Sequence, residues 1–501
     1  MTTIDWIKRA QEANLRVRHF IEGQYVELAE GNRLQKISPR DGSFLYEIPS
    51  DASAEMNQAV ASAKQSFRDK RWRSLPLHQR QAILIKLADL IESHQETFAL
   101  YESLDAGKPI SHALGEVIQA SGMIREAANG ADKLFSSYLA DGSYCAYKLH
   151  KPVGVVGAIT SWNYPLVIEA LKVGPALIMG NSLVLKPSEH ASLSANLLAA
   201  LALEAGVPPG VLNVVNGAGR TVGSIMAHHR DVGLLSFTGS SVTGQQLQVA
   251  AGKSNMKRLL LECGGKSPYL IFEDCPADLD MLAADIVAMA FQNQSQNCMA
   301  GSRLLIQASI KEQLLPKVIE QAAKLIPQDP LLPDTTFGAM IHEAHMTKVL
   351  DYIESGKREG ATLVQGGKRA SVDTGVNGSE GFYIEPTIFD NVNPQQKIAQ
   401  EEIFGPVLSV LTFDHEQEAI ELANSTCYGL AAYVATENIG QAQRLSHEID
   451  AGSVMIVGTS TPAPCYREIG KEGHRESGFG VEGGTFGLAS YSLCTSVHQW
   501  T

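Results

Sequence analysis

The chain has 501 residues, more than one hydrophobic core usually holds, so we expect two or three domains. Its 44% hydrophobic and 19% charged residues are typical of a soluble globular protein, and its net charge of −13 argues against a nucleic-acid or anionic-membrane partner. Residues 1–20 carry charges throughout and no apolar signal region, and no apolar run is long enough to span a membrane, so we expect a cytoplasmic protein.

The N-terminal part of the chain combines a short β segment with helices. Residues 19–28 indicate the β segment, in which Gly23 can form a tight turn. Gly107 and Pro109 mark the end of a long helical pattern. Apolar residues three and four apart predict helices over residues 53–69, 77–105 and about 112–135.

From residue 153 onward the pattern becomes α/β. Apolar strands alternate with helices, which indicates a parallel sheet covered on both faces. A second α/β series occupies residues 267–457. In the first series, strands are predicted at residues 153–160, 182–186, 211–215, 233–237 and 257–262, and helices at 191–204 and 242–251.

Two segments that are distant in sequence, residues 144–150 and 488–499, alternate like exposed strands. A linker is predicted just before the first of them, at residues 140–143. Neither segment has an obvious partner strand. Because unpaired edges invite aggregation unless they are covered, we predict that they pair across the subunits of a homodimer or homotetramer.

The seven cysteines are far apart and never form a CxxC pair. This spacing fits neither a disulfide framework nor a zinc site, so we expect reduced thiols and no bound metal. Cys298 differs from the others because a polar run of amides and one serine precedes it at residues 292–297 and small residues follow it at 300–302. A structural cysteine usually has apolar neighbours, so this loop suits a reactive thiol as well as an ordinary one.

Two glycine-rich stretches follow predicted strands. Gly217 and Gly219 fail the dinucleotide-binding fingerprint because Val222 stands where the third glycine belongs, and we interpret them as a turn. FTGSSVTG at residues 237–244 opens a helix, so its N–H groups can bind a pyrophosphate, although a plain βα turn has the same appearance.

Polar side chains stand at three predicted strand ends, where α/β sheets bind ligands. In LKPSE at residues 185–189, the acidic residue can accept hydrogen bonds from ribose hydroxyls, unless the stretch is a solvated loop. Glu262 follows an apolar strand and precedes two glycines, so burial would raise its pKa toward that of a general base, unless a salt bridge neutralises it. Asn163 can donate to a developing oxyanion or form a turn.

Taken together and in this order, these motifs resemble those of the aldehyde dehydrogenase superfamily. The resemblance extends over nearly the whole chain, from the β segment near Phe20 to the strand before Trp500. The matching stretches are WNYP at 162–165, LKPSE at 185–189, FTGSSVTG at 237–244, LECGGKSP at 261–268, NQSQNC at 293–298 and EEIFGPV at 401–407.

The resemblance implies an α/β fold with two Rossmann-type parallel-sheet domains and a small β oligomerisation arm. The implied NAD-binding domain comprises residues 1–134 and 153–265, the catalytic domain 266–468, and the arm 135–152 and 480–501. The implied reaction is the oxidation of a small-molecule aldehyde to a carboxylic acid with NAD, NADP being the alternative cofactor.

The resemblance also implies a role for each matching residue. Cys298 would be the nucleophile that forms a thiohemiacetal and then a thioester, and Glu262 would activate the hydrolytic water. Asn163 and the backbone N–H of Cys298 would form the oxyanion hole. The implied cofactor contacts are Trp162, Lys186, Glu189, Gly239, Ser240, Gly244, Glu402 and Phe404.

The chain departs from the family pattern most clearly at residues 455–480. Relatives usually have a VN-containing strand there, then a PFGG-type turn and a K-S-G ending. Because this segment helps wall the family's substrate tunnel, the resemblance defines the substrate only as an aldehyde. The general sequence is most similar to bacterial enzymes that act on γ-glutamyl-aminobutyraldehyde and related ω-amino aldehydes.

Three other functions fit the sequence less well. A CoA-acylating dehydrogenase generally lacks the base, so Glu262 disfavours it. A cofactor-free cysteine hydrolase would need a histidine paired with Cys298, and none of the motifs contains one. A non-catalytic binding or structural protein on the same fold would not need to keep Cys298, Glu262 and Asn163 together.

Overall fold

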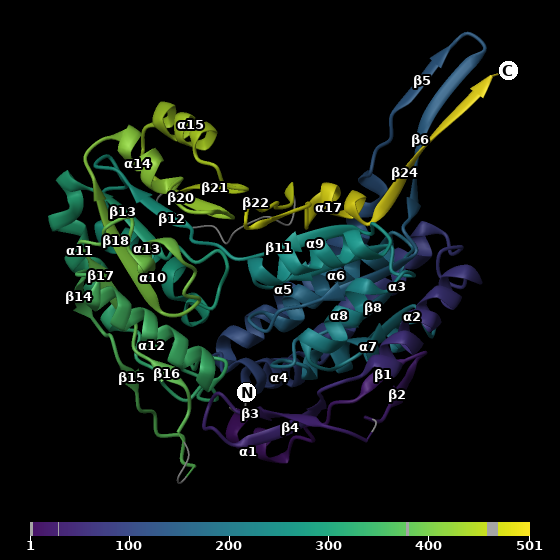
Figure 1. Cartoon of the computed structure of the whole chain (residues 1–501), viewed down its shortest axis with the longest axis horizontal. Coiled ribbons are helices and arrows are strands. Elements are labelled where there is room, and N and C mark those ends of the chain that lie inside the picture. The colour runs from purple at the N-terminus through teal and green to yellow at the C-terminus, as the bar shows by residue number, and fades with distance from the viewer. Residues whose placement is uncertain (1–3, 29, 377–379, 458–468, 501) are drawn as a thin grey trace.

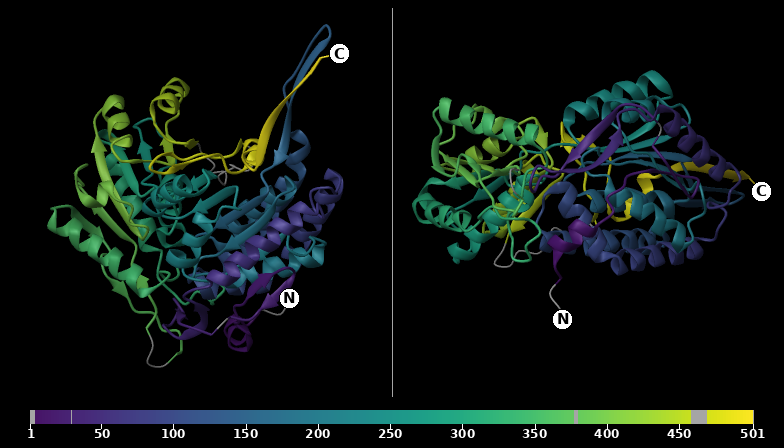
Figure 2. Two further views of the ribbon diagram at one scale, coloured as in Figure 1. Left: turned by 45° about the vertical axis from the view of Figure 1, so that its right-hand side comes forward. Right: turned by 90° about the horizontal axis from the view of Figure 1, so that it is seen from below.

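The computed structural model describes residues 4–28, 30–376, 380–457 and 469–500. Two lobes lie side by side, each built around a sheet, and a three-stranded arm projects from one of them (Figure 1). Figure 2 shows the lobes and the projecting arm from two further directions. Within the described ranges, no helix is both long enough and apolar enough to cross a membrane.

The first lobe contains an eight-stranded sheet in the order β2-β1-β9-β8-β7-β10-β11-β23. The strands from β9 to β11 are parallel, whereas the β1/β2 hairpin and β23 pair antiparallel with their neighbours. The predicted strands of the first α/β series are present to within two residues at each end. The bounds are β1 (His19–Ile21), β2 (Gln24–Val26), β7 (Val155–Ile159), β8 (Ser182–Lys186), β9 (Leu212–Val214), β10 (Leu234–Thr238), β11 (Arg258–Glu262) and β23 (Gly478–Phe479).

Helices cover both faces of this sheet, so β7 and β8 are buried along their whole length. A hairpin of β3 (Arg33–Ile37) and β4 (Phe44–Pro49) lies at the N-terminal edge of the lobe. The helices are α1 (Trp6–Glu12), α2 (Ser53–Arg68), α3 (Leu77–Ser93), α4 (Gln95–Ala106), α5 (Ile110–Gly130), α6 (Pro165–Ile178), α7 (Leu193–Ala205), α8 (Ser224–His228) and α9 (Ser241–Ser254).

The prediction of one helix over residues 77–105 is wrong, because the chain breaks at His94 into α3 and α4. His94 has φ −105° and ψ 19°, outside the helical region. Its backbone N–H and its ring Nδ1 both lie within hydrogen-bond distance of Leu90 O, at 3.1 and 2.9 Å. Both helices pack into one apolar core, so the apolar spacing continues across the break and does not reveal it.

The second lobe contains a seven-stranded sheet in the order β14-β17-β18-β13-β12-β20-β21, in which β14 alone is antiparallel to its neighbour. Leu304 and Ile306 enter one apolar cluster and Leu305 the other, so both faces are covered. The strands are β12 (Pro268–Ile271), β13 (Arg303–Gln307), β14 (Thr362–Gln365), β17 (Thr387–Asp390), β18 (Val407–Phe413), β20 (Ala431–Ala435) and β21 (Ser453–Val457). The helices are α10 (Leu279–Phe291), α11 (Ala308–Ala323), α12 (Glu343–Arg358), α13 (Lys397–Gln400), α14 (Glu416–Ala423) and α15 (Ile439–Glu448).

In the described part of the chain, two further short strand pairs and one short helix lie outside the two large sheets and the arm. They are the pair β15 (Arg369–Ala370) and β16 (Tyr383–Ile384), the pair β19 (Tyr428–Gly429) and β22 (His474–Arg475), and helix α17 (Gly484–Ser490). Helix α17 packs on α5 of the first lobe and leads directly into the arm. The C-terminal segment therefore returns from the second lobe to the first (Figure 1).

The arm corrects two predictions. It consists of β5 (Tyr138–Asp141), β6 (Tyr144–Pro152) and β24 (Ser492–Trp500). Residues 140–143 are the end of β5 and the tight turn to β6, so they are not a linker. The segments expected to lack a partner pair with each other within one chain, in antiparallel register from Ser492 opposite Pro152 to Trp500 opposite Tyr144. Sequence spacing does not reveal this pairing, because it depends on the path of the whole chain between them.

Candidate functional site

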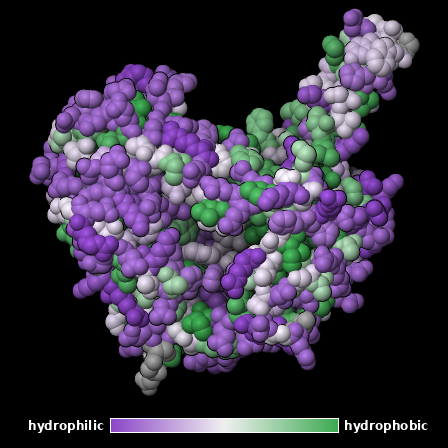
Figure 3. Space-filling model, viewed as in Figure 1, coloured by the Kyte–Doolittle hydropathy of each residue, from purple (hydrophilic) through white to green (hydrophobic). Residues whose placement is uncertain are grey.

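The predicted site residues lie where the carboxyl ends of the first sheet's strands face the second lobe. Asn163 follows β7, Lys186 ends β8 and Glu262 ends β11. Hydrogen bonds cross between the lobes at this edge, from Asn163 Nδ2 to Gln296 O at 3.0 Å and from Gly265 N to Glu402 Oε1 at 2.9 Å. The surface on the face drawn in Figure 3 is hollowed between the two lobes. This is the position at which parallel α/β sheets bind ligands.

The loop that carries Cys298 has an unusual backbone. Asn293, Gln294 and Ser295 are consecutive non-glycine residues with left-handed φ values of 52°, 57° and 55°. Buried polar contacts hold this conformation, including Asn293 Nδ2 to Asn163 O at 2.9 Å and Ser295 Oγ to Ala290 O at 2.5 Å. The amides that precede the cysteine therefore fix the loop, and strain of this kind is typical of functional sites.

Cys298 is partly buried beside Met299, Leu430 and Ala431. Its backbone lies so close to Gly265 that a Cβ there would come within 2.3 Å of Cys298 O. Burial raises the pKa of the Cys298 thiol to about 11, although the Lys471 charge opposes the shift. The thiol is therefore protonated near neutral pH and needs a proton acceptor before it can act as a nucleophile.

Glu262 combines the two interpretations that its sequence left open. Its side chain is only 3% exposed, and its Oε2 accepts a hydrogen bond from Lys471 Nζ at 2.7 Å. Its Oε1 accepts no hydrogen bond from the part of the chain that the structure describes. Burial raises the pKa of Glu262, the Lys471 charge lowers it and Glu482 raises it, so the carboxyl is both desolvated and ion-paired.

The Asn163 side chain is buried and fixed in orientation. Its Oδ1 accepts from Ser161 Oγ at 2.8 Å, which turns its Nδ2 toward the cysteine loop, where it donates to Gln296 O. The Asn163 carbonyl accepts from the buried Lys108 Nζ at 2.9 Å. The amide therefore presents its N–H groups at the loop of Cys298, as an oxyanion donor must.

Lys186 and Glu189 form a pair at the end of β8. Lys186 Nζ lies 3.4 Å from Glu189 Oε2, and Glu189 Oε1 accepts from Gly219 N at 3.1 Å. Burial alone would raise the pKa of Glu189, but the Lys186 charge and the Gly219 N–H lower it to about 2. Gly219, in the stretch that we interpret as a turn, thus fixes the Glu189 carboxylate. The incomplete dinucleotide-binding fingerprint did not indicate this contact.

FTGSSVTG forms the predicted βα turn and opens α9. Ser240 is the N-cap residue, and its Oγ accepts from Thr243 N at 3.3 Å. Gly239 N donates to Glu262 O at 3.0 Å. A Cβ at Gly244 would come within 2.8 Å of Cys263 Sγ, so this glycine also allows α9 to pack on the residue after Glu262.

Glu402 and Phe404 reach the site from the second lobe. Burial raises the pKa of Glu402 to about 7, and a Cβ at Gly264 would come within 2.5 Å of its Oε2. Phe404 has φ 59°, and its ring meets Trp162 edge to face at 5.2 Å between centroids. His345 Nε2 donates to Phe404 O at 2.7 Å and so holds this left-handed residue.

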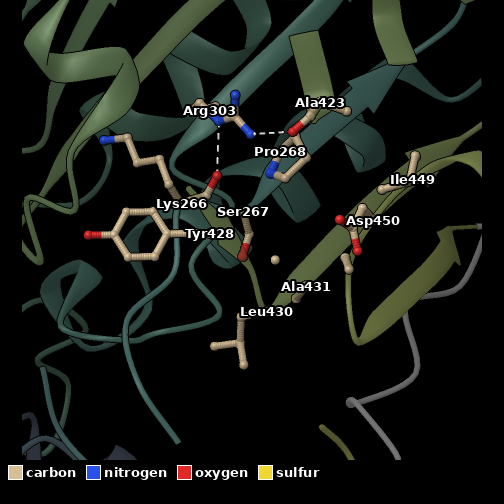
Figure 4. A pocket seen from close by; sticks show the side chains of 12 residues that line it. Lys266, Ser267, Pro268, Arg303, Ala423, Tyr428, Leu430, Ala431, Ile449 and Asp450 are labelled. Carbon is tan, nitrogen blue, oxygen red and sulfur yellow. Dashed lines mark hydrogen bonds between the residues drawn. The ribbon is translucent and has the colours of Figure 1, made fainter. Parts of the chain in front are cut away.

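Arg303 supports the turn that follows Glu262. Its buried guanidinium donates to Lys266 O at 2.9 Å and to Ala423 O at 2.8 Å (Figure 4). Lys266 follows Gly264 and Gly265 directly, so these bonds limit the movement of the glycine turn between Glu402 and Cys298. Arg303 follows the small residues after Cys298 directly, and no sequence motif indicated this role.

Sequence reasoning missed several further polar residues. Lys172 Nζ donates to Glu482 Oε1 at 2.7 Å and to Ser236 Oγ at 2.8 Å, in a fully buried cluster. A lysine inside helix α6, whose only other charged residue is Glu169, is the signal that could have identified it. Lys471 and Glu482 lie in or next to the atypical 455–480 segment, of which residues 458–468 are outside the described residues.

Comparisons with known proteins show which family the chain is similar to. A model of the family described as "Aldehyde dehydrogenase family" matches residues 25–497. NADP/NAD-dependent aldehyde dehydrogenase PuuC of Escherichia coli (strain K12) is 42% identical over 453 residues, which cover 90% of each chain. Aminoacetaldehyde dehydrogenase of Pseudomonas aeruginosa is 40% identical over 93% of this chain and 94% of the relative. A crystal structure of indole-3-acetaldehyde dehydrogenase complexed with NAD+ superimposes with a TM-score of 0.95, at 43% identity and 99% coverage of both chains.

Proposed function

The chain belongs to the aldehyde dehydrogenase family and oxidises aldehydes to carboxylic acids with NAD, and from that premise we propose which residues carry the reaction. Cys298 is the nucleophile, Glu262 is the general base, and the Asn163 amide with the Cys298 N–H forms the oxyanion hole. The observation that carries this assignment is the convergence of these three residues, which are remote in sequence, at one edge of the first sheet. The test is whether an acyl group accumulates on Cys298 when Glu262 loses its basicity.

The reaction begins with activation of the thiol. Since burial keeps the Cys298 thiol protonated, its proton must pass to a base before the sulfur attacks the carbonyl carbon. The Lys471 charge lowers the pKa of this thiol and so favours the loss of its proton, while Glu262 is needed as a base only in the hydrolysis that follows. The negative charge that develops on the substrate oxygen is stabilised by the Asn163 N–H that is not donated to Gln296 O, and the orientation of this amide is fixed in advance.

The second half of the reaction releases the acid. The thioester on Cys298 is attacked by a water molecule, and Glu262 accepts the proton of that water. The Oε1 atom of Glu262 is available for this purpose because only its Oε2 is engaged by Lys471. Water is the acyl acceptor in this scheme, which distinguishes it from the CoA-acylating alternative.

The proposed cofactor contacts fit a dinucleotide. Glu189 offers an ionised carboxylate to ribose hydroxyls, the N-terminus of α9 offers N–H groups to phosphates, and Glu402 and Phe404 face the site from the second lobe. Gly264 leaves room where a side chain would collide with Glu402. When bound, NAD supplies the two-electron acceptor that aldehyde oxidation requires. Lys186, Gly239, Ser240, Gly244 and Trp162 complete the proposed contact set.

The substrate class proposed is the ω-amino aldehydes. The support is the relative named for aminoacetaldehyde, at 40% identity. A screen that follows NADH absorbance over aliphatic, aromatic and ω-amino aldehydes tests it, and kcat/KM is expected to be highest for an ω-amino aldehyde. A higher value for indole-3-acetaldehyde would contradict the substrate class while leaving the proposed chemistry intact.

We also propose a cytoplasmic homo-oligomer that associates through the arm. Large apolar side chains stand exposed on its strands, notably Tyr138 at 69%, Leu139 at 58% and Trp500 at 76%. Apolar groups in such a projecting element suit a protein interface better than solvent. In the same proposal, residues 1–134 and 153–265 form the NAD-binding domain, 266–468 the catalytic domain, and 135–152 with 480–501 the arm.

A further inference from the structure

Lys471 occupies a position next to Glu262 that its own backbone determines. Its N–H donates to Glu482 O at 2.8 Å, and its carbonyl accepts from Glu482 N at 2.9 Å. A few residues later, β23 pairs antiparallel with β11, placing Gly478 opposite Glu262. The lysine is therefore held beside the end of β11 by main-chain bonds as well as by its charge.

The side-chain contact is short and largely withdrawn from solvent. Lys471 Nζ lies 2.7 Å from Glu262 Oε2, and the two side chains are 11% and 3% exposed. An ion pair in such surroundings is screened much less than one at the surface. Breaking it would leave an uncompensated charge, so the pair fixes both the ionisation and the orientation of the carboxylate.

Other charged and titratable groups also change the pKa values of Glu262, Lys471 and Cys298. The Glu482 charge raises the pKa of both Glu262 and Lys471. Lys172 neutralises this charge, because its Nζ lies 2.7 Å from Glu482 Oε1. The Glu402 charge, in the second lobe, raises the pKa of the Cys298 thiol. Among these groups, Lys471 is the cation that contacts Glu262 directly. The interacting groups include Glu262, Cys298, Lys471, Glu482, Lys172, Glu402, Cys263 and Tyr491.

We propose that Lys471 is a positioning residue that holds Glu262 as an oriented carboxylate, leaves Oε1 to the hydrolytic water, and lowers the pH at which both thiol activation and deacylation become fast. The proposal rests on the role assigned to Glu262 above. It also gives a function to a lysine in the segment where this chain departs most from its relatives. Removal of a cation favours protonation of Glu262 and of the Cys298 sulfur alike, so both pH dependences should move upward.

The test measures two pH profiles, neither of which needs the cofactor. The first is the alkylation rate of Cys298 by iodoacetamide, followed by mass spectrometry. The second is the hydrolysis rate of the acetyl-enzyme made with p-nitrophenyl acetate, an activated ester that acylates thiols. In Lys471→Met, both profiles are expected to shift to higher pH by about 1 to 3 units, the range for loss of an adjacent opposite charge.

Two variants serve as controls. Lys471→Arg keeps the charge and should keep both profiles near the wild-type positions. Lys324→Met makes the same substitution at a surface lysine that is 58% exposed and pairs with Glu320 at 3.6 Å, and it should shift neither profile. A structural role alone would lower the melting temperature or the active fraction of Lys471→Met without moving its pH profiles.

A further pair of variants keeps the proposal falsifiable if Lys471→Met does not fold. Glu262→Gln combined with Lys471→Met removes both charges, so no buried ion is left unpaired. Its alkylation profile should lie at higher pH than that of Glu262→Gln alone. Coincident profiles for these two variants, or an unshifted Lys471→Met, would overturn the role of Lys471. Normal acetyl-enzyme hydrolysis in Glu262→Gln would instead overturn the role of Glu262.

Discussion

Replacing Gly265 or Gly264 by alanine tests whether the turn after Glu262 sets the position of the nucleophile. A Cβ at Gly265 would lie 2.3 Å from Cys298 O, 1.1 Å less than the 3.4 Å at which ordinary contact begins. The obstacle is backbone, so the cysteine loop must move by about 1 Å, and a displacement of that size costs about 10²-fold in rate. A Cβ at Gly264 would meet Glu402 Oε2 at 2.5 Å, so there the displaced group is the side chain of a proposed cofactor contact.

The two substitutions are expected to separate chemistry from cofactor binding. Gly265→Ala should lower kcat about 10²-fold and change the alkylation rate of Cys298, with little effect on the Kd for NAD measured by tryptophan fluorescence. Gly264→Ala should weaken NAD binding and leave alkylation nearly unchanged. Gly252→Ala is the matched control, since a Cβ there has nothing within 4 Å. Wild-type turnover in Gly265→Ala would refute the argument that this glycine positions the thiol.

Three further predictions concern the nucleophile, the cofactor and the arm. Cys298→Ala should abolish aldehyde oxidation while keeping NAD binding, because the cofactor contacts lie elsewhere; comparable turnover would exclude the covalent mechanism. The kcat/KM with NAD should exceed that with NADP by about tenfold or more, since the ionised Glu189 repels a 2′-phosphate. Glu189→Gln should narrow this NAD/NADP ratio, and the same ratio in the wild type and in Glu189→Gln would contradict the argument. Sedimentation at micromolar concentration should give at least twice the 54.0 kDa chain mass, and truncation before Ala489 should give monomer or aggregate; a fully active monomer from either chain would defeat the proposed role of the arm.

Local patterns predicted most of the framework of the site. The strands that end at Lys186 and Glu262 are continuous apolar runs, and the βα turn at Ser240 has the N-cap residue expected of a helix start. These features depend on neighbouring residues, so the sequence is sufficient to place them. The break at His94 is also local, but a continuous apolar face conceals it.

What the sequence did not reveal depends on contacts between distant segments. The Lys471–Glu262 pair joins residues 209 positions apart, and the pairing of β6 with β24 spans a still longer stretch of chain. The Gly219 N–H that fixes Glu189 belongs to a loop whose sequence matches no phosphate-binding pattern. Each contact follows from the fold as a whole, because sequence spacing gives no register between such segments.

The measurement that tests the central claim most directly is the pre-steady-state time course of NADH formation in Glu262→Gln. The introduced amide can still accept a hydrogen bond from Lys471, so the substitution removes basicity with little change of shape. The account predicts a burst of about one NADH per active site, then a slow phase, with the acyl group found on Cys298 by mass spectrometry. Linear NADH formation at the wild-type rate, with no acyl group on Cys298, would contradict it.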